Sequence, residues 1–303
     1  SKLDKYPVLS NLDVENQKAG ARVEVDTEKR NPHDFAVWIK APENHLMKWD
    51  SPWGPSYPGW HIECSVMSQK YLGEVFDIHT GGIDLIPTHH ENEIAQSKGM
   101  CGKIPANYWM HREFLLINGG KMSKSLGNVY LLQDIVDRGY DPLVYKLFCY
   151  SIQYRKKLNF TWEGMDSAKI ALDRLREAYQ KHLNGTENVA EELIAKYEKD
   201  FNEAINDDLN MPVAMSVVWE VAKRTEKSKK LAELLKKFDR VLGIKIDEYK
   251  EEEIPDYIKE LLTKRAEARK NKDWAESDKI RDIIKEKGYI VKDSKEGQTV
   301  QKI

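Results

Sequence analysis

The fold class of this chain is decided by the stretch Phe76-Asp77-Ile78-His79-Thr80-Gly81-Gly82, which has the pattern of a buried β-strand that runs into a glycine turn. A helical pattern precedes it from His61 to near Gly73, and a second helix is predicted over His89–Ser97. Another short strand is expected within Tyr108–Ile117. Strands that alternate with helices predict a parallel sheet, with ligands bound at the carboxyl ends of its strands.

The chain upstream of this α/β segment has a different character. Residues 1–33 are polar and contain one convincing strand pattern, Ala21–Val25, which alternates as a half-buried strand does. Too few apolar residues are present here to close a core, so this segment is interpreted as the end of a larger unit. From Asp34 onward the sequence becomes aromatic and rich in turns.

A glycine-bracketed loop follows the last of these strands: Gly119-Gly120-Lys121-Met122-Ser123-Lys124-Ser125-Leu126-Gly127-Asn128. Its two lysines, three residues apart, carry compact positive charges on a segment that the glycines leave free to move. Such charges suit phosphate oxygens, which indicates a phosphate-binding loop. The alternative is a solvated surface turn, the usual structure of a lysine-rich loop.

The chain beyond this loop is predicted to be mostly helical. Apolar residues at spacings of three and four form four stripes, which predict the core of an antiparallel bundle. The stripes are Leu172, Leu175, Tyr179 and Leu183; Leu193, Ile194, Tyr197, Phe201, Ala204 and Ile205; Val217, Val218 and Val221; and Leu231, Leu234, Leu235, Phe238, Val241 and Leu242. Asn184-Gly185 is a reasonable end for the first helix, and residues 207–212 predict a helix stop and restart.

An acidic run, Asp247–Glu253, predicts a linker to a small C-terminal domain of two short helices and a hairpin. The helices are expected over about 256–270 and 274–287, and the hairpin between Tyr289 and Val300. The first helix and the start of the second are basic and include Trp274. Such runs are usually charged helix faces, but basic residues beside an aromatic ring also hold unpaired bases.

The composition is that of a soluble globular protein of 303 residues, with 41% hydrophobic and 32% charged residues. No apolar run approaches the ~20 residues that a membrane-spanning helix needs. The net charge of −2 argues against general coating of nucleic acid and is compatible with a local basic face. Three cysteines (Cys64, Cys101 and Cys149) cannot all pair, so a reducing cytoplasm is expected.

Cys64, His89 and Glu93 are candidates for a metal site. His89 and Glu93 lie four apart on one predicted helix, so they share a face and can reach one metal ion. Cysteine, histidine and carboxylate together suit zinc. His90 competes with His89, because it is three residues from Glu93 and the spacing allows either. On spacing alone, a buried cysteine and a surface His–Glu pair are the more frequent arrangement.

Taken together, these motifs resemble the cysteinyl-tRNA synthetases, which are class I aminoacyl-tRNA synthetases. The resemblance rests on Trp60–Ser65 (WHIECS), His79–Leu85 (HTGGIDL), His89–Ser97 (HHENEIAQS) and Lys121–Ser125 (KMSKS), in the right order and at the right separations. It implies ATP-dependent activation of cysteine to cysteinyl-adenylate and transfer of cysteine to tRNA(Cys). It also implies Mg²⁺ with the ATP, one Zn²⁺ per active site, and a cytoplasmic monomer without a membrane partner.

The resemblance assigns roles to the matching residues. Lys121 and Lys124 would be the catalytic residues that stabilise the ATP phosphates. Zinc would bind the substrate thiolate, held by Cys64, His89 and Glu93, and would thereby reject serine, whose hydroxyl binds zinc far more weakly. The other implied residues are Gly81, Gly82 and Asp84 for ATP, Trp60 and His79 for the substrate cysteine, and Arg269, Trp274 and Asp278 for the tRNA anticodon.

The resemblance covers about the last two thirds of a family member. Thr88 stands where the family usually has a proline before the paired histidines. No His-x-Gly-His motif occurs, and neither Cys101 nor Cys149 matches the remaining zinc ligand of the family. The expectation is therefore a C-terminal portion that needs an N-terminal fragment carrying the His-Ile-Gly-His motif.

The implied fold is the second half of a Rossmann-type parallel-sheet catalytic domain, an antiparallel α-helical bundle and a small C-terminal α+β domain. The expected divisions are 1–33 (end of an inserted domain), 34–118 (catalytic half), 119–160 (lysine loop and connecting helices), 161–246 (tRNA-binding bundle) and 255–303 (anticodon recognition). Two alternative functions are a non-catalytic tRNA-binding protein derived from a synthetase and a cysteine-activating ligase of the mycothiol pathway.

Overall fold

The computed structural model describes residue 3 and residues 5–10, 29–31, 34–248, 254–294 and 297–302. The strand predicted at Ala21–Val25 lies outside the described residues. The chain divides into two compact units, Ser1–Asp247 and Glu248–Ile303. The finer divisions expected at residues 33, 118 and 160 remain predictions.

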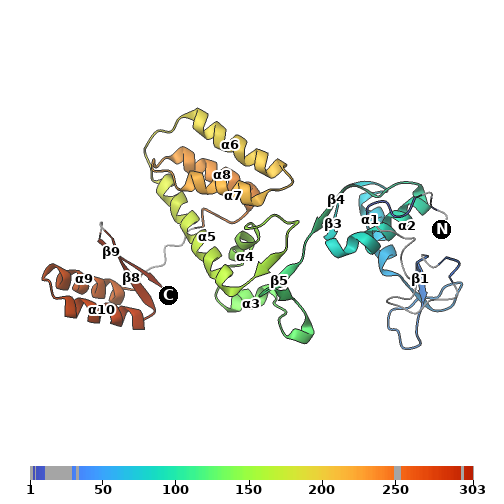
Figure 1. Ribbon diagram of the computed structural model, residues 1–303, viewed down its shortest axis with the longest axis horizontal. Coiled ribbons are helices and arrows are strands. Elements are labelled where there is room, and N and C mark those ends of the chain that lie inside the picture. The colour runs from blue at the N-terminus through green and yellow to red at the C-terminus, as the bar shows by residue number, and fades with distance from the viewer. Residues whose placement is uncertain are drawn as a thin grey trace. The chain divides into compact units, whose positions relative to one another are not determined.

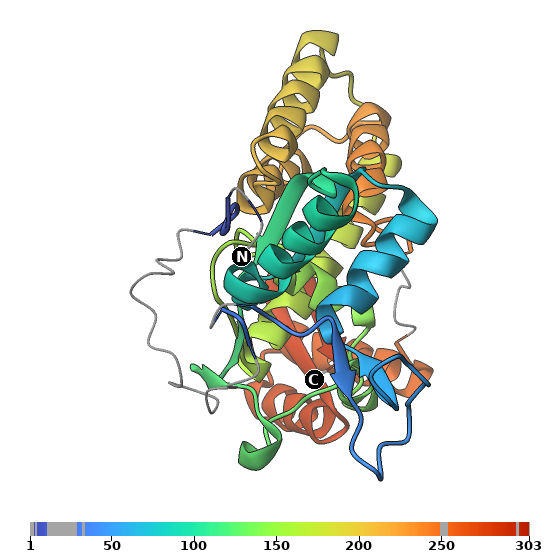
Figure 2. The same ribbon diagram turned by 90° about the vertical axis from the view of Figure 1, so that its right-hand side faces the viewer.

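The α/β segment of the first unit is a parallel pair of strands joined through a helix. β3 (Phe76–Gly82) pairs in parallel with β4 (Ala106–Arg112), and α2 (Glu91–Cys101) lies between them in the chain. α1 (Trp60–Leu72) precedes β3 and packs beside α2, as Figures 1 and 2 show. The expected α/β class of this segment is confirmed.

Two short turns connect β3 to α2. A 3-10 turn spans Ile83–Leu85, and a π-helical turn spans Ile86–His90. The second helix was expected to begin at His89, but the α-helix proper begins two residues later. Before this segment, β1 (Trp38–Lys40) and β2 (Ser56–Pro58) form a small antiparallel pair.

A three-stranded sheet introduces the helical part of the first unit. β5 (Leu115–Ile117) pairs antiparallel with β6 (Gly120–Lys121) and parallel with β7 (Leu158–Phe160). The single strand expected within 108–117 is thus two strands, β4 and β5. Between β6 and β7 lie a 3-10 turn, Lys124–Leu126, and the helices α3 (Leu132–Asp137) and α4 (Pro142–Cys149).

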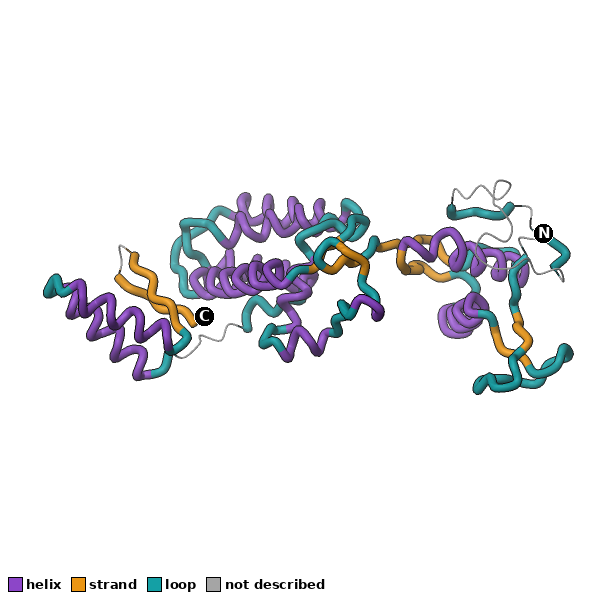
Figure 3. The backbone as a smooth tube through the Cα atoms, turned by 60° about the horizontal axis from the view of Figure 1, so that its bottom comes forward, coloured by secondary structure: helices purple, strands orange, loops and turns teal. Residues whose placement is uncertain are grey.

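Four longer helices form the bundle that follows, as the purple tubes in the middle of Figure 3 show. They are α5 (Trp162–Leu183), α6 (Glu191–Asn206), α7 (Met211–Ala222) and α8 (Lys229–Leu242). Most residues of the four predicted stripes lie in the bundle core or pack against it. Leu183 and Val241 are exceptions, because the neighbouring His182 and Leu242 occupy the buried positions of the last turns.

The end of α5 shows why glycine is needed at position 185. α5 ends at Leu183, with Asn184 as its cap, and Gly185 passes so close to another segment that a Cβ there would lie 2.1 Å from the backbone carbonyl of Lys227. Thr186 and Ser228 form an isolated β-bridge at the same place. The predicted helix end at Asn184-Gly185 is confirmed, and the glycine also permits this close backbone approach.

The second unit pairs two helices with a hairpin. α9 (Asp256–Lys270) packs against α10 (Trp274–Glu286), and β8 (Tyr289–Ser294) pairs antiparallel with β9 (Gly297–Lys302). Arg265 is fully buried and donates two hydrogen bonds to the carboxylate of Asp293, at 2.8 and 2.9 Å. The small α+β architecture expected for this part is confirmed.

Among the described residues, none of the helices combines the length and the apolar composition needed to cross a lipid bilayer.

Candidate functional site

The side chains of the candidate site come from four neighbouring elements. α1 carries Cys64, and the last residues of the π-helical turn are His89 and His90. Glu93 follows in the first turn of α2, and His79 lies on β3. Both histidines are buried, and the burial continues through Ala95, so every side of this start of α2 is covered.

The three predicted metal ligands lie together. One ligand atom each from Cys64, His89 and Glu93 falls within 4.8 Å of the other two. The Nε2 atom of His89 is 3.5 Å from Oε1 of Glu93. A second group, His79, His90 and Glu93, meets the same distance limit, so both histidines that the spacing allowed lie near this carboxylate.

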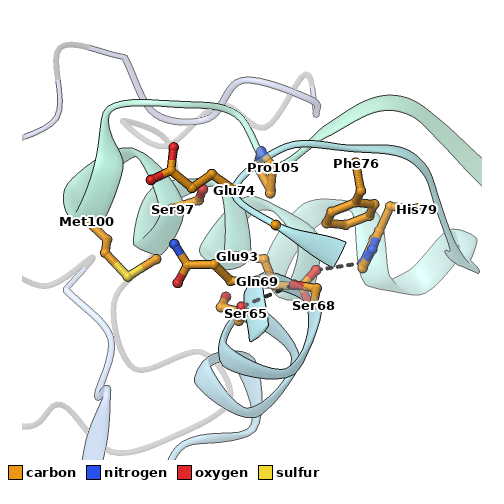
Figure 4. Close-up of a pocket in the computed structure, with 11 residues that line it drawn as sticks. Ser65, Ser68, Gln69, Glu74, Phe76, His79, Glu93, Ser97, Met100 and Pro105 are labelled. Atoms are coloured by element: carbon orange, nitrogen blue, oxygen red, sulfur yellow. Dashed lines mark hydrogen bonds and ion pairs between the residues drawn. The ribbon is translucent and has the colours of Figure 1, made fainter. Parts of the chain in front are cut away.

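Glu93 is the residue that both groups share. The residue is 2% exposed, and neither carboxylate oxygen accepts a well-directed hydrogen bond from the described residues. The Nε2 atom of His79 lies 3.0 Å from Oε2, the separation of an ion pair, and Figure 4 shows these two side chains pointing toward one another. Buried carboxylates are normally hydrogen-bonded or paired with a cation, so this environment fits a bound metal ion.

The surroundings of the cluster disfavour charged side chains in the absence of a cation. Burial raises the pKa of the Cys64 thiol, and the nearby Glu93 carboxylate raises it further. Burial lowers the pKa of His90 to about 4, so its imidazole is neutral near neutral pH. A divalent cation would reverse this balance at the thiol, because it favours the thiolate.

The residues expected near the substrates lie around this cluster. Trp60 begins α1, and its ring centroid is 4.3 Å from that of His89. Gly81 and Gly82 end β3, where a Cβ on Gly82 would lie 2.4 Å from Oδ1 of Asp84 in the next turn. The carboxyl end of β3 is thus the position at which a parallel sheet binds ligands.

The lysine loop is held at its base by Asn128. Its Oδ1 accepts a hydrogen bond from the Ser123 backbone N–H at 2.8 Å, and its Nδ2 donates to the Lys121 carbonyl at 2.9 Å. Lys121 and Lys124 are exposed, and neither makes an ion pair within the described part of the chain. Both ammonium groups are therefore available to a phosphate.

The predicted anticodon residues are distributed over both helices of the second unit. Trp274 is the first residue of α10 and is 59% exposed, and Asp278 lies one turn later on the same face. Arg269, near the end of α9, donates a hydrogen bond to Asp293 at 2.7 Å. The exposed indole is suited to stacking on a base.

Known protein families match the chain in three places. A family described as "tRNA synthetases class I (C) catalytic domain" matches residues 1–170, one described as "DALR domain" matches 200–247, and one described as "Cysteinyl-tRNA ligase anticodon binding domain" matches 251–300. The first match covers more than half of the chain.

The chain belongs to the cysteinyl-tRNA synthetase family. Cysteine–tRNA ligase 1 of Burkholderia lata is 43% identical over 303 residues, which cover 98% of this chain and 63% of that protein. The cysteine–tRNA ligase of Treponema denticola is 41% identical and is covered to 68%, with all of this chain aligned. This member of the family thus spans about two thirds of the length of these relatives.

The fold is also similar to that of a solved class I synthetase. The LeuRS chain of a ternary complex with tRNA and LeuAMS from Agrobacterium radiobacter K84 matches with a TM-score of 0.50 and 15% sequence identity. The match covers 65% of this cysteinyl-tRNA synthetase family member and 32% of the LeuRS chain. At this identity the likeness concerns the fold alone.

Two histidines of this family member were missed by the sequence reasoning. Nδ1 of His61 lies 2.8 Å from Nδ1 of His89, and Nε2 of His111 lies 2.7 Å from Nδ1 of His90. His61 carried a usable signal, because it is three residues before Cys64 on the same helix and therefore on the same face. His111 carried none, since its place beside His90 depends on the pairing of β3 with β4.

Proposed function

We propose that this chain carries the metal-binding and phosphate-binding half of a cysteine–tRNA ligase. That enzyme would activate cysteine with ATP and Mg²⁺ to cysteinyl-adenylate and transfer the cysteine to tRNA(Cys), in the cytoplasm. The observation that carries the proposal is the buried carboxylate of Glu93, which has no well-directed hydrogen bond among the described residues and lies beside a thiol and an imidazole. Family membership supports the same reaction.

Cys64, His89 and Glu93 would hold one Zn²⁺, because their donor atoms converge and match the ligands that zinc prefers. When bound, zinc would supply a soft Lewis acid that coordinates a thiolate in preference to a hydroxyl. Trp60 and His79 would border the cysteine, and Gly81, Gly82 and Asp84 would approach the adenosine of ATP. Lys121 and Lys124 would stabilise the phosphates as pyrophosphate leaves.

Arg269, Trp274 and Asp278 would contact the anticodon of tRNA(Cys). The match of residues 251–300 to an anticodon-binding family supports tRNA as the acceptor over the sugar acceptor of a mycothiol-pathway ligase. The intact lysine loop supports catalysis over a role in tRNA binding alone.

A further polypeptide segment would complete the catalytic half. α1 has no buried residue, and Ile78 of β3 lies opposite Tyr108 of β4 with both side chains more than half exposed. Strands of parallel sheets are ordinarily covered on both faces. We propose that an N-terminal fragment carrying a His-Ile-Gly-His motif and the remaining zinc ligand covers this surface, either on the same polypeptide or as a separate chain.

The test is cysteine-dependent pyrophosphate exchange by the chain together with the N-terminal part of a relative. Lys124→Ala should depress exchange while leaving tRNA binding nearly intact, because the loop acts on the phosphates of ATP. Unchanged exchange in Lys124→Ala would show that the phosphate role is wrong. Native mass spectrometry with zinc analysis gives an independent measure, and a protein without zinc would contradict the proposed metal site.

A further inference from the structure

Two of the buried histidines near Glu93 each contact a second imidazole. His89 meets His61 of α1 through the Nδ1 atoms, at 2.8 Å, and His90 meets His111 of β4, at 2.7 Å. In a hydrogen bond between two imidazoles one nitrogen donates and the other accepts. Either ring can donate, and a metal ion on Nε2 of His89 would leave the proton on its Nδ1, which then donates to Nδ1 of His61.

The contact with His61 leaves the other nitrogen of His89 facing the candidate metal position. With Nδ1 engaged, Nε2 is the atom that remains for a ligand, and it is the atom that lies 3.5 Å from Oε1 of Glu93. His61 also precedes Cys64 by three residues on α1, so one helix face supplies both the thiol and the imidazole that orients His89.

The ring of His61 is itself held in place by packing. Phe35 meets it edge-on, with ring centroids 5.8 Å apart and an interplanar angle of 84°. The Trp60 ring stacks on it at 6.0 Å. Because its neighbours restrict its rotation, His61 can hold the orientation of His89.

The His90–His111 contact joins Nδ1 of His90 to Nε2 of His111, and its environment differs from that of the His61–His89 contact. The free Nε2 of His90 faces the backbone of Gly81, where a Cβ would lie 2.9 Å from Nε2 and 2.7 Å from Cε1. The ring of His90 also packs against those of His79 and Trp109, at 4.7 and 5.1 Å between centroids. His90 also has a ligand atom within 4.8 Å of Glu93, but its Nε2 is crowded by the Gly81 backbone, which favours a packing role.

We propose that His61 is a positioning residue for the metal centre. It holds His89 in the tautomer and orientation that present Nε2 beside Cys64 and Glu93, whereas the His90–His111 pair does not hold the metal. This inference rests on the proposed zinc site, and it also decides between the two histidines that sequence spacing left open.

The test is the dissociation constant of Zn²⁺ from the chain combined with the N-terminal part of a relative, measured by competition with a chromogenic chelator. His61→Gln places its amide where Nε2 was and should weaken zinc binding by about 10- to 100-fold. His61→Asn places its amide where Nδ1 was and should retain most of the affinity. If His61→Gln does not fold, His61→Phe serves as the disrupting variant, because it keeps the ring volume without the hydrogen bond.

His111 offers a matched control, because it uses Nε2 where His61 uses Nδ1. His111→Asn should break the contact with His90, and His111→Gln should keep it; neither should change zinc affinity. Wild-type affinity in a folded His61→Gln or His61→Phe variant, or an equal loss in His111→Asn, would overturn the positioning role while leaving the zinc site standing. Failure of the unmodified chain to take up zinc when combined with that N-terminal part would overturn both proposals.

Discussion

Glu91 binds the segment of residues 8–10 to the start of α2 through hydrogen bonds, and replacing it with glutamine tests how much these bonds stabilise the contact. The carboxylate is fully buried. Its Oε1 accepts hydrogen bonds from the backbone N–H groups of Leu9 and Ser10, at 2.6 and 2.5 Å, and its Oε2 accepts one from Val8 at 2.8 Å. Three backbone donors from one segment therefore depend on a single side chain.

The expected loss follows from the chemistry of the amide. In Glu91→Gln one oxygen remains to accept from Leu9 and Ser10, but the NH₂ group meets the N–H of Val8, so two donors face each other. A hydrogen bond to a charged group contributes about 1.5–3 kcal/mol. A loss of about 2 kcal/mol favours opening of the segment by about 30-fold, at about 1.4 kcal/mol for each factor of ten.

Hydrogen–deuterium exchange of the Val8, Leu9 and Ser10 amides measures this opening directly. These amides should exchange about 30-fold faster in Glu91→Gln than in the unmodified protein. Tyr6→Phe is the control, because it removes one neutral hydrogen bond, from the Tyr6 hydroxyl to Oδ1 of Asn92 at 2.8 Å. It should accelerate exchange only about fivefold, for about 1 kcal/mol. Wild-type exchange rates in Glu91→Gln would refute the reasoning.

Three further predictions concern the bundle and the second unit. Gly185→Ala should lower the free energy of unfolding of the first unit, measured in urea, by about 2–4 kcal/mol, because its Cβ would meet the Lys227 backbone. Gly99→Ala is the control and should not lower it, because no atom lies within 4 Å of its Cβ. Burial, and then the charge of Lys227, lower the pKa of His182, so the unfolded chain binds the proton more readily. The melting temperature should therefore fall as the pH drops below about 6.5, the unfolded value, and His182→Gln should flatten this dependence if the assignment is right. Trp274→Ala should weaken binding of tRNA(Cys) without altering pyrophosphate exchange, and loss of exchange would contradict an anticodon role for this exposed indole.

The sequence predicted the order of elements well because its apolar spacing is regular. The stripe that contains Leu172 and Leu175 reports directly which helix face is buried. Residues brought together by one helix were equally predictable from the sequence, since a separation of four placed His89 beside Glu93. The contact of His111 with His90 could not be predicted from the sequence, because it depends on the pairing of β3 with β4.

The spacing of apolar residues along a helix also does not report contacts with a segment distant in the sequence. The sequence placed the end of α5 correctly at Asn184-Gly185, but it did not show that the missing side chain of Gly185 admits the backbone of Lys227. Leu183 belonged to a predicted apolar stripe, but His182 takes the buried place, with Nε2 at 3.1 Å from the Val221 carbonyl. In both cases the deciding neighbour is about 40 residues away in the sequence, beyond the reach of helical periodicity.

The geometry of the candidate metal centre depends more on the number of residues in the π-helical turn Ile86–His90 than on the type of each residue there. Each residue of a regular helix turns its successor by about 100°. Removing one residue before His89 would therefore rotate His89 and Glu93 together relative to His79 on β3, while an exchange such as threonine for proline at position 88 keeps the count. Sequence variants of this turn should accordingly differ by substitution, with insertions and deletions confined to the segments on either side.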